Sequence, residues 1–196
     1  DNGTFISESH YLLDLVKTLQ YDTIYHEHLR YYSLRSLENL FSMHDLEIFH
    51  AKRIPTHGGS IREYAGKPGK HDKTNSVEKL LNEEDTLGLS DGSLLKNFRE
   101  KVIKTKTDFY ELIAPIKRSE QRIYGIGAPS RASTLINYLG IDDGIMDGVM
   151  EVSSSHKIGK YIPGTRIPVL DEKILYENQP EYALLLSWHI ATELST

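Results

Sequence analysis

The chain has 196 residues, of which 39% are hydrophobic and 26% are charged, and its formal net charge is −5 at pH 7. It is long enough to bury a sizeable core, and because it has no basic excess we expect no nucleic-acid or membrane partner. Cysteine is absent, which excludes disulfides, thiolate metal sites and a cysteine nucleophile and favours a reducing compartment such as the cytoplasm. No apolar run approaches about 18 residues, so the sequence predicts no membrane-spanning helix.

Residue patterns in the first part of the chain predict two strands joined by a tight turn, with helices around them. β-formers and helical spacing indicate, in chain order, a strand at 4–9, a helix from residue 12, a helix from Ser33 as N-cap to about residue 44, strands at 46–54 and 60–66, and helices from 76 to about 120 with a break at 88–93. Pro115 is expected to kink or end the last helix.

The residue pattern changes after position 120, where it predicts short apolar strands that alternate with helices. The strands are expected at 122–128, 145–152, 167–169 and 182–188, and the helices at 130–140, closed by Gly140, and at 170–178. This alternation predicts an α/β fold with a Rossmann-like, doubly wound parallel sheet, preceded by the β-hairpin and the long helices.

The stretch "YHEH" at 25–28 could carry proton-transfer chemistry. A histidine beside a carboxylate and phenolic hydroxyls suits a general base. Two alternatives stay open: a polar-aromatic segment held by hydrogen bonds, and a zinc or manganese site built on His26 and His28.

The stretch "HGGSIR" at 57–62 could approach a ligand closely. Paired glycines admit a ligand to the backbone, and Arg62 can bind a phosphate. An ordinary hairpin turn explains the same residues.

Two stretches in the second half could hold an anion. In "GIGAPSR" at 125–131, a strand runs into a helix start that can present backbone N–H groups. As a dinucleotide fingerprint it has Ser130 where the third glycine belongs, and Glu151 is the nearest candidate for a ribose. Lys157 and Lys160, in a loop shaped by glycine and proline, could close over a diphosphate or simply be solvated.

Taken in order, these stretches resemble the C-terminal half of the SAM-dependent sugar C-methyltransferases that act on nucleotide-linked keto sugars. The matching segments, which span about residues 4–188, are "YDTIYHEHLRYYSLRSLENLF", "HGGSIREY", "GIGAPSRASTLINYLGI" and "HKIGKYIPGTRIPV". The family's A-K-G-N after G-A-P is here "SRAS", its Asp-Arg pair after the second strand is "EVSSS", and its W-N is "WHI". The resemblance therefore does not identify the nucleotide or the sugar.

The resemblance implies deprotonation of a carbon next to a ketone, followed by attack on the methyl group of S-adenosylmethionine, in deoxysugar biosynthesis. It implies that Tyr25, Glu27 and His28 are catalytic. His28 is then the general base, Glu27 orients it or stabilises its charged form, and Tyr25 hydrogen-bonds the keto oxygen or shares in the proton transfer. We expect His26 to point away from His28.

The substrate-binding residues are expected in two groups. His57, Gly58, Gly59 and Arg62 line the sugar side. The nucleotide diphosphate lies near a second group, namely Gly127, Ala128, Ser130, Arg131, Lys157 and Lys160. No metal is expected.

The resemblance also implies further domains of the same polypeptide, a zinc-binding segment and a SAM-binding domain. We expect residues 1–32 to be the trailing end of that SAM-binding domain plus the catalytic segment, and 33–196 to be the C-terminal substrate-binding domain. The chain alone would then lack most of the SAM site and be inactive. The alternatives are a non-catalytic sugar-nucleotide-binding module and a fragment of an NAD-dependent oxidoreductase.

Overall fold

The chain divides into two compact units, each with its own sheet. The computed structural model describes residues 2–191, apart from the side chains at positions 57 and 189. The first unit comprises the residues up to Gln20 together with His28–Val102, and the second comprises Tyr21–Glu27 together with the residues from Ile103 onward. We call Tyr21–Glu27 the inserted segment. The boundary expected at residue 33 from the sequence lies inside the first unit.

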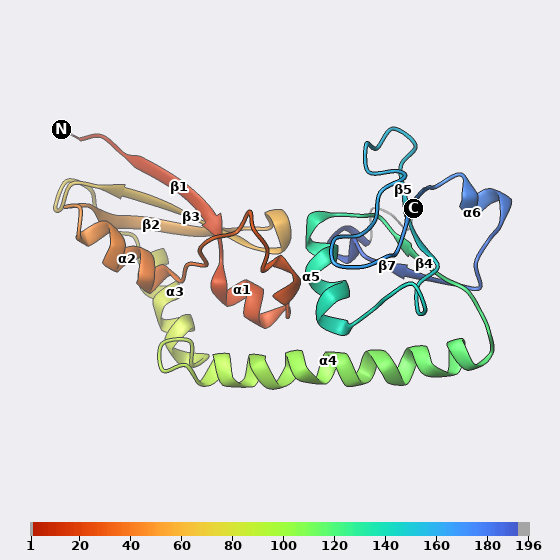
Figure 1. Ribbon diagram of the computed structural model, residues 1–196. Coiled ribbons are helices and arrows are strands. Elements are labelled where there is room, and N and C mark those ends of the chain that lie inside the picture. Colours follow the sequence, from red (N-terminus) through yellow and green to blue (C-terminus); the bar gives the residue numbers. More distant parts are fainter. Residues whose placement is uncertain (1, 192–196) are drawn as a thin grey trace. The chain divides into compact units, whose positions relative to one another are not determined.

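The first unit is a three-stranded antiparallel sheet with helices packed against it (Figure 1). Its elements are β1 (Phe5–His10), α1 (Leu12–Lys17), α2 (Leu34–Ser42), β2 (Glu47–Ile54), β3 (Ser60–Gly66), α3 (Asn75–Thr86) and the first part of α4 (Ser93–Arg118). The strand order is β1-β3-β2, with β3 antiparallel to both neighbours. The predicted hairpin and its flanking helices are confirmed.

Local sequence signals explain where α2 begins and which face it buries. The Ser33 hydroxyl accepts a hydrogen bond from the backbone N–H of Ser36 at 3.1 Å, which satisfies a donor that the helix start leaves open. Leu34, Leu37 and Phe41 recur at helical spacing, and all three are buried in the core of this unit.

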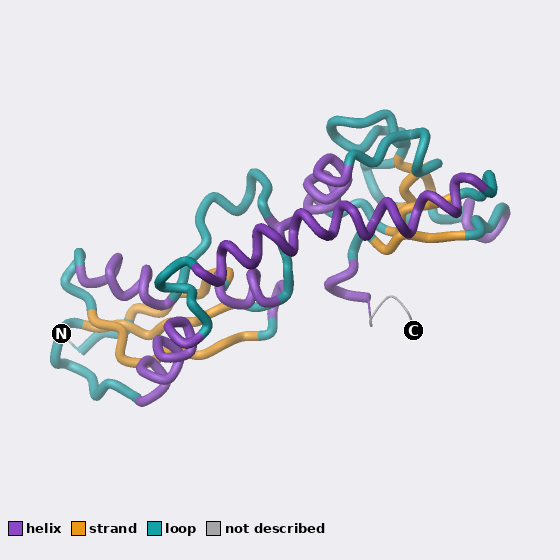
Figure 2. Tube along the Cα trace, turned by 90° about the horizontal axis from the view of Figure 1, so that it is seen from below, coloured by secondary structure: helices purple, strands orange, loops and turns teal. Residues whose placement is uncertain are grey.

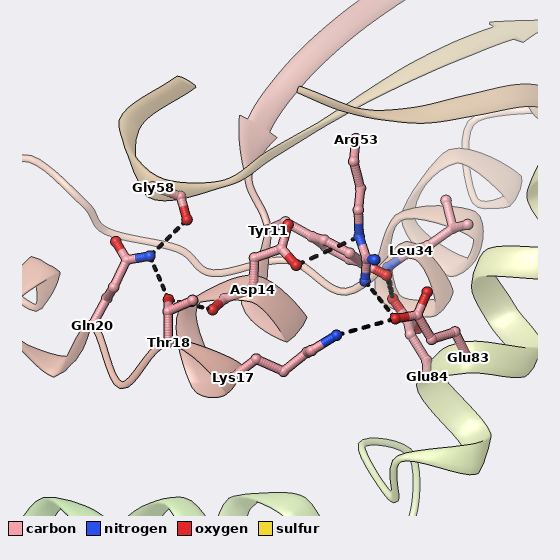
Figure 3. A network of polar contacts seen from close by, with 10 residues as sticks. All are labelled: Tyr11, Asp14, Lys17, Thr18, Gln20, Leu34, Arg53, Gly58, Glu83 and Glu84. Atoms are coloured by element: carbon pink, nitrogen blue, oxygen red, sulfur yellow. Dashed lines mark hydrogen bonds and ion pairs between the residues drawn. The ribbon is translucent and has the colours of Figure 1, made fainter. Parts of the chain in front are cut away.

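A buried carboxylate joins three elements of the first unit (Figure 3). Glu84 of α3, 0% exposed, accepts hydrogen bonds from the Tyr11 hydroxyl at 2.9 Å and from the backbone N–H groups of Leu34 and Arg35 at 2.6 and 3.2 Å. Burial, and next the charge of Glu84, raise the pKa of the Tyr11 hydroxyl, which keeps it a donor. A carboxylate at the start of α2 also complements the helix dipole.

The second unit is built on a four-stranded parallel sheet (Figures 1 and 2). Its elements are the rest of α4, β4 (Ile123–Ile126), α5 (Ser130–Leu139), β5 (Gly148–Glu151), β6 (Val169–Asp171), α6 (Ile174–Glu177) and β7 (Tyr182–Leu185). The order β6-β5-β4-β7 means that the chain first adds strands on one side of β4 and then crosses to the other side. In Rossmann-like sheets, ligands bind at the carboxyl ends of the strands near this reversal. The predicted fold class is confirmed.

Two helix ends test the sequence interpretation. Gly140 has φ +75° and closes α5 in the left-handed conformation, as predicted. Pro115 does not end α4, which continues to Arg118. Of the two expected outcomes, a kink or an end, the end was wrong: Pro115 removes only the hydrogen bond that its own N–H would donate to the carbonyl four residues earlier, and the helix continues past it. The kink stays a prediction. No helix of the described residues combines the length and apolar composition needed to cross a bilayer.

A buried ion pair holds the inserted segment on the second unit. Arg131 of α5 donates through Nε and Nη2 to the two oxygens of Asp22 at 2.8 and 2.6 Å, and both side chains are nearly inaccessible. The indole Nε1 of Trp188 donates to the same carboxylate at 2.8 Å, and the Arg131 guanidinium lies over the indole ring. The Thr134 hydroxyl donates to the carbonyl of Ile24 at 2.9 Å, so Asp22 and Ile24 are both tied to α5.

Glu63 is a second buried carboxyl of the first unit, in the middle of β3. Its side chain is 0% exposed, and the Ser7 hydroxyl donates to Oε2 at 2.6 Å. Oε1 accepts no hydrogen bond from the described residues. Burial raises the pKa of Glu63 to about 7, against the opposing hydrogen bond from Ser7.

We expect Asp22→Ala to destabilise the second unit strongly. The change leaves the buried guanidinium of Arg131 without its carboxylate, which costs about 3–5 kcal/mol in the free energy of unfolding. Urea unfolding followed by circular dichroism measures the loss. Asp143→Ala is the matched control, because Asp143 pairs with Arg166, whose side chain is 84% exposed, and exposed pairs contribute about 1 kcal/mol or less. Equal losses in the two variants would contradict this account.

We also expect the stability of the first unit to fall as pH rises toward neutrality. The folded pKa of Glu63, about 7, lies above its ordinary value of 4.5, so the folded state holds the proton more tightly. Its contribution is fully present below about pH 4.5 and is lost as pH rises through about 7, amounting to roughly 3 kcal/mol at most. Glu63→Gln should flatten this part of the pH dependence of urea unfolding, whereas Glu78→Gln, at an exposed position on α3, should not. An unchanged slope in Glu63→Gln would disprove the assignment.

Candidate active site and substrate pocket

A pocket of about 330 Å³ lies within the second unit. Three segments bound it: positions 25–26 of the inserted segment, the start of α5 with the turn before it at 128–133, and parts of the loop 157–169 between β5 and β6. It therefore lies next to the carboxyl end of β4, where the fold predicts ligand binding. Four predicted substrate-binding residues line it, namely Ala128, Ser130, Lys157 and Lys160.

The turn after β4 is held from inside the protein. The backbone N–H of Gly127 donates to the carbonyl of Met150 at 2.9 Å, and that of Ala128 donates to Glu151 Oε2 at 2.8 Å. Pro129 has no N–H. The expectation that this turn offers its N–H groups to an anion is thus wrong for the two residues before Pro129, because the end of β5 already occupies them.

Glu151 stands where a dinucleotide-binding protein places its ribose-binding carboxylate. Here that carboxylate accepts the Ala128 N–H instead, which gives no support to the NAD interpretation. Gly127 has φ +79°, and a Cβ there would lie 2.6 Å from the hydroxyl of Ser187, the second residue after β7. Glycine is therefore required at this turn for close packing with the chain beyond β7.

The two predicted lysines have different surroundings. Lys157 Nζ donates to the carbonyl of Ala128 at 2.6 Å, so it fixes the turn. Lys160 is exposed and lines the pocket. Of the two, Lys160 is the cation that a ligand can reach without displacing an internal hydrogen bond.

Arg131 was predicted to bind substrate, but its guanidinium is buried against Asp22 and Trp188. We therefore assign it to positioning the inserted segment. Apart from their opposite charges, nothing in the sequence indicates this pairing, since Asp22 and Arg131 are 109 positions apart.

Tyr25 and Glu27 of the predicted catalytic set lie in the inserted segment. Tyr25 is half-buried in the pocket wall, and its hydroxyl donates to Glu27 Oε2 at 3.3 Å. Glu27 also lies 3.9 Å from Nε2 of His26, which lines the pocket as well. The sequence interpretation assigned His26 no contact with substrate.

His28 belongs to the first unit, where its ring contacts two other rings. Its centroid lies 5.4 Å from that of His10, at the end of β1, and 6.5 Å from that of Tyr31. His26 and His28 are thus assigned to different units. Among residues 2–191, no group of three or more His, Cys, Asp or Glu side chains is arranged to hold a metal ion.

Of the remaining predicted residues, His57, Gly58 and Gly59 lie at the turn between β2 and β3 of the first unit, and Arg62 lies in β3. The Gly58 carbonyl accepts a hydrogen bond from Gln20 Nε2 at 2.6 Å (Figure 3), and Gly59 has φ +127°. Arg62 donates through Nε and Nη2 to one oxygen of Glu8 at 2.8 and 2.6 Å. The side chain of His57 lies outside the described residues.

Comparisons with known proteins identify the family of the chain. The family model "C-methyltransferase C-terminal domain" matches residues 55–196. C-methyltransferase NovU of Streptomyces niveus is 32% identical over 199 residues, covering 98% of this chain and 46% of the relative. The chain thus spans about half the length of this curated relative. It belongs to the family of C-methyltransferase C-terminal domains.

Proposed function

We propose that this chain binds the substrate and supplies the catalytic base of a larger SAM-dependent C-methyltransferase, whose substrate is a keto sugar linked to a nucleoside diphosphate. Membership of the C-methyltransferase family supports the reaction class. The observation that carries the substrate assignment is the pocket of the second unit, where a phenol, an exposed lysine and a helix start line one cavity.

The diphosphate of such a substrate suits the part of the pocket next to α5. Lys160 offers a positive charge, and Ser130, the first residue of α5, offers a hydroxyl at the positive end of the helix dipole. Lys157 supports the site through its hydrogen bond to Ala128. The diphosphate is thus bound mainly by side chains, since the N–H groups of Gly127 and Ala128 are already used.

The keto sugar would place its carbonyl oxygen at the hydroxyl of Tyr25. The role of general base stays with His28 as the family resemblance implies: it takes the proton from the carbon next to the carbonyl, the C–H bonding pair moves into the enolate, and negative charge develops on the oxygen. The Tyr25 hydroxyl turns its one proton from Glu27 to that oxygen, and the new hydrogen bond stabilises the charge. Glu27, already hydrogen-bonded to Tyr25, stabilises the positive charge that His28 acquires.

The described residues do not form a recognisable site for S-adenosylmethionine. In the first unit, β1 passes into α1 through Tyr11, which is fully buried, and not through a glycine-rich turn. In this proposal the methyl donor binds in a preceding domain of the same polypeptide.

The outer strand β1 is where such a domain would join. Phe5 and Ile6 are 51% and 55% exposed, and β1 pairs only with β3 among the described strands. A strand at the edge of a sheet has backbone N–H and C=O groups that a further strand can pair with. In this proposal the preceding domain includes β1, and its sheet continues through β3 and β2.

Lys160→Ala should weaken binding of a nucleoside diphosphate about tenfold, because a charge-assisted hydrogen bond contributes about 1.5–3 kcal/mol. Calorimetry with uridine, thymidine and guanosine diphosphates measures the change. Lys173→Ala removes the same charge from an exposed position next to α6, outside the pocket, and should leave affinity unchanged. Equal affinities for both variants would show that the pocket does not bind the diphosphate.

His28→Asn should slow deprotonation by roughly a hundredfold or more, the usual contribution of a general base. The readout is exchange of the substrate C–H in heavy water, followed by NMR, in the complete polypeptide without a methyl donor. His44→Asn, at an exposed position after α2, is the matched control. Undiminished exchange in His28→Asn would rule out His28 as the base while leaving the binding pocket in place.

A further inference from the structure

The loop between β5 and β6 carries a rigid ribbon along the pocket. The backbone N–H of Val169 donates to the carbonyl of Lys160 at 2.8 Å, and that of Ile162 donates to the carbonyl of Ile167 at 3.0 Å. We call residues 159–169 the ribbon. Its antiparallel hydrogen bonds hold the backbone on both sides of its tip in one arrangement.

The tip of the ribbon is fastened to α5. Asn137 Nδ2 donates to the carbonyls of Pro163 and Ser133 at 2.9 and 2.8 Å. Gly164 follows with φ +83°, and a Cβ there would lie 2.4 Å from Asn137 Oδ1, so this close approach requires glycine. The ribbon is thus fixed to the helix whose start forms the opposite side of the pocket.

This ribbon presents an aromatic ring that the fold does not bury. Tyr161 is 63% exposed, yet it lines the pocket directly after Lys160. Its backbone bridges to Pro168 across the ribbon, so the ring projects from a fixed position. A large aromatic side chain is normally packed against apolar neighbours, and one left open on a rigid wall of a cavity is suited to stack on a ligand.

The covalent order of sugar, diphosphate and nucleoside indicates which part of the substrate lies at the Tyr161 ring. In the proposed function the sugar lies at Tyr25 and the diphosphate at Lys160. Covalent order places the nucleoside on the far side of the diphosphate from the sugar. Among the described residues that line this pocket, Tyr161 is the aromatic side chain next to the cation and not assigned to the sugar.

We propose that Tyr161 is the stacking platform for the nucleobase of the substrate, and that this residue supplies a large part of the affinity for the nucleotide. The proposal rests on the proposed function and extends it. Stacking on a phenol ring accepts any base, so Tyr161 contributes affinity rather than choice among bases.

The test uses uridine diphosphate, which has a base and a diphosphate but no sugar. Tyr161→Ala should weaken its binding to the chain about tenfold, within the range that such truncations cause. Tyr161→Phe should retain the wild-type affinity, because the ring remains. Pyrophosphate, which has no base, should bind both variants and the wild type equally. Tyr176→Ala is the matched control, since Tyr176 on α6 is 83% exposed and lies outside the pocket.

A base stacked on a phenol ring should also show upfield-shifted base protons in the NMR spectrum of bound uridine diphosphate, and Tyr161→Ala should abolish the shift. If Tyr161→Ala binds uridine diphosphate as the wild type does while Lys160→Ala binds it weakly, the stacking proposal fails and the diphosphate site stands. If uridine diphosphate does not bind and Lys160→Ala leaves the affinity for pyrophosphate unchanged, the diphosphate site and the stacking platform are both disproved. If Tyr161→Ala weakens the binding of pyrophosphate as much as that of uridine diphosphate, the ring acts only on the structure of the ribbon and stacking is disproved.

Discussion

The buried ion pair between Asp22 and Arg131 is the interaction on which the candidate site depends. An unpaired charge in a protein interior is costly, so each of these side chains can be buried only where it meets the other. Because Asp22 is near the start of the inserted segment, the pair places Tyr25 and His26 in the pocket wall. The indole N–H of Trp188 satisfies the carboxylate further, which links the chain after β7 to the same point.

The fold could be predicted well from the sequence because its signals are local. The Ser33 cap, the glycine that closes α5 and the alternation of apolar strands with helices each depend on a few neighbouring residues. The expected end of α4 at Pro115 failed for a reason the pattern cannot show. A proline removes the hydrogen bond from its own N–H to the carbonyl four residues earlier and crowds that carbonyl, but the other hydrogen bonds of a long helix can keep the helix continuous.

The site could be predicted only in part, because side-chain identity does not show which groups are already occupied. The glycine-rich turn after β4 has the composition of an anion site, yet Glu151 takes the N–H of Ala128 and Lys157 takes its carbonyl. Arg131 is a residue type that commonly binds phosphate, but here its guanidinium is paired with Asp22. The two residues of each of these contacts are 23 to 109 positions apart in the sequence, so no local sequence pattern predicts the contacts.

Once the occupied groups are set aside, the motif residues of the second unit divide by accessibility. Asp22, Arg131 and Glu151 have their polar atoms engaged inside the unit, and so does Lys157, although it also lines the pocket. Ser130, Lys160 and Tyr161 are exposed and line the same pocket. The internal contacts fix the backbone that carries the accessible groups. This lowers the entropic cost of ordering those groups when a ligand binds. Changes to the internal set should therefore alter stability and binding together, while changes to the accessible set should alter binding alone.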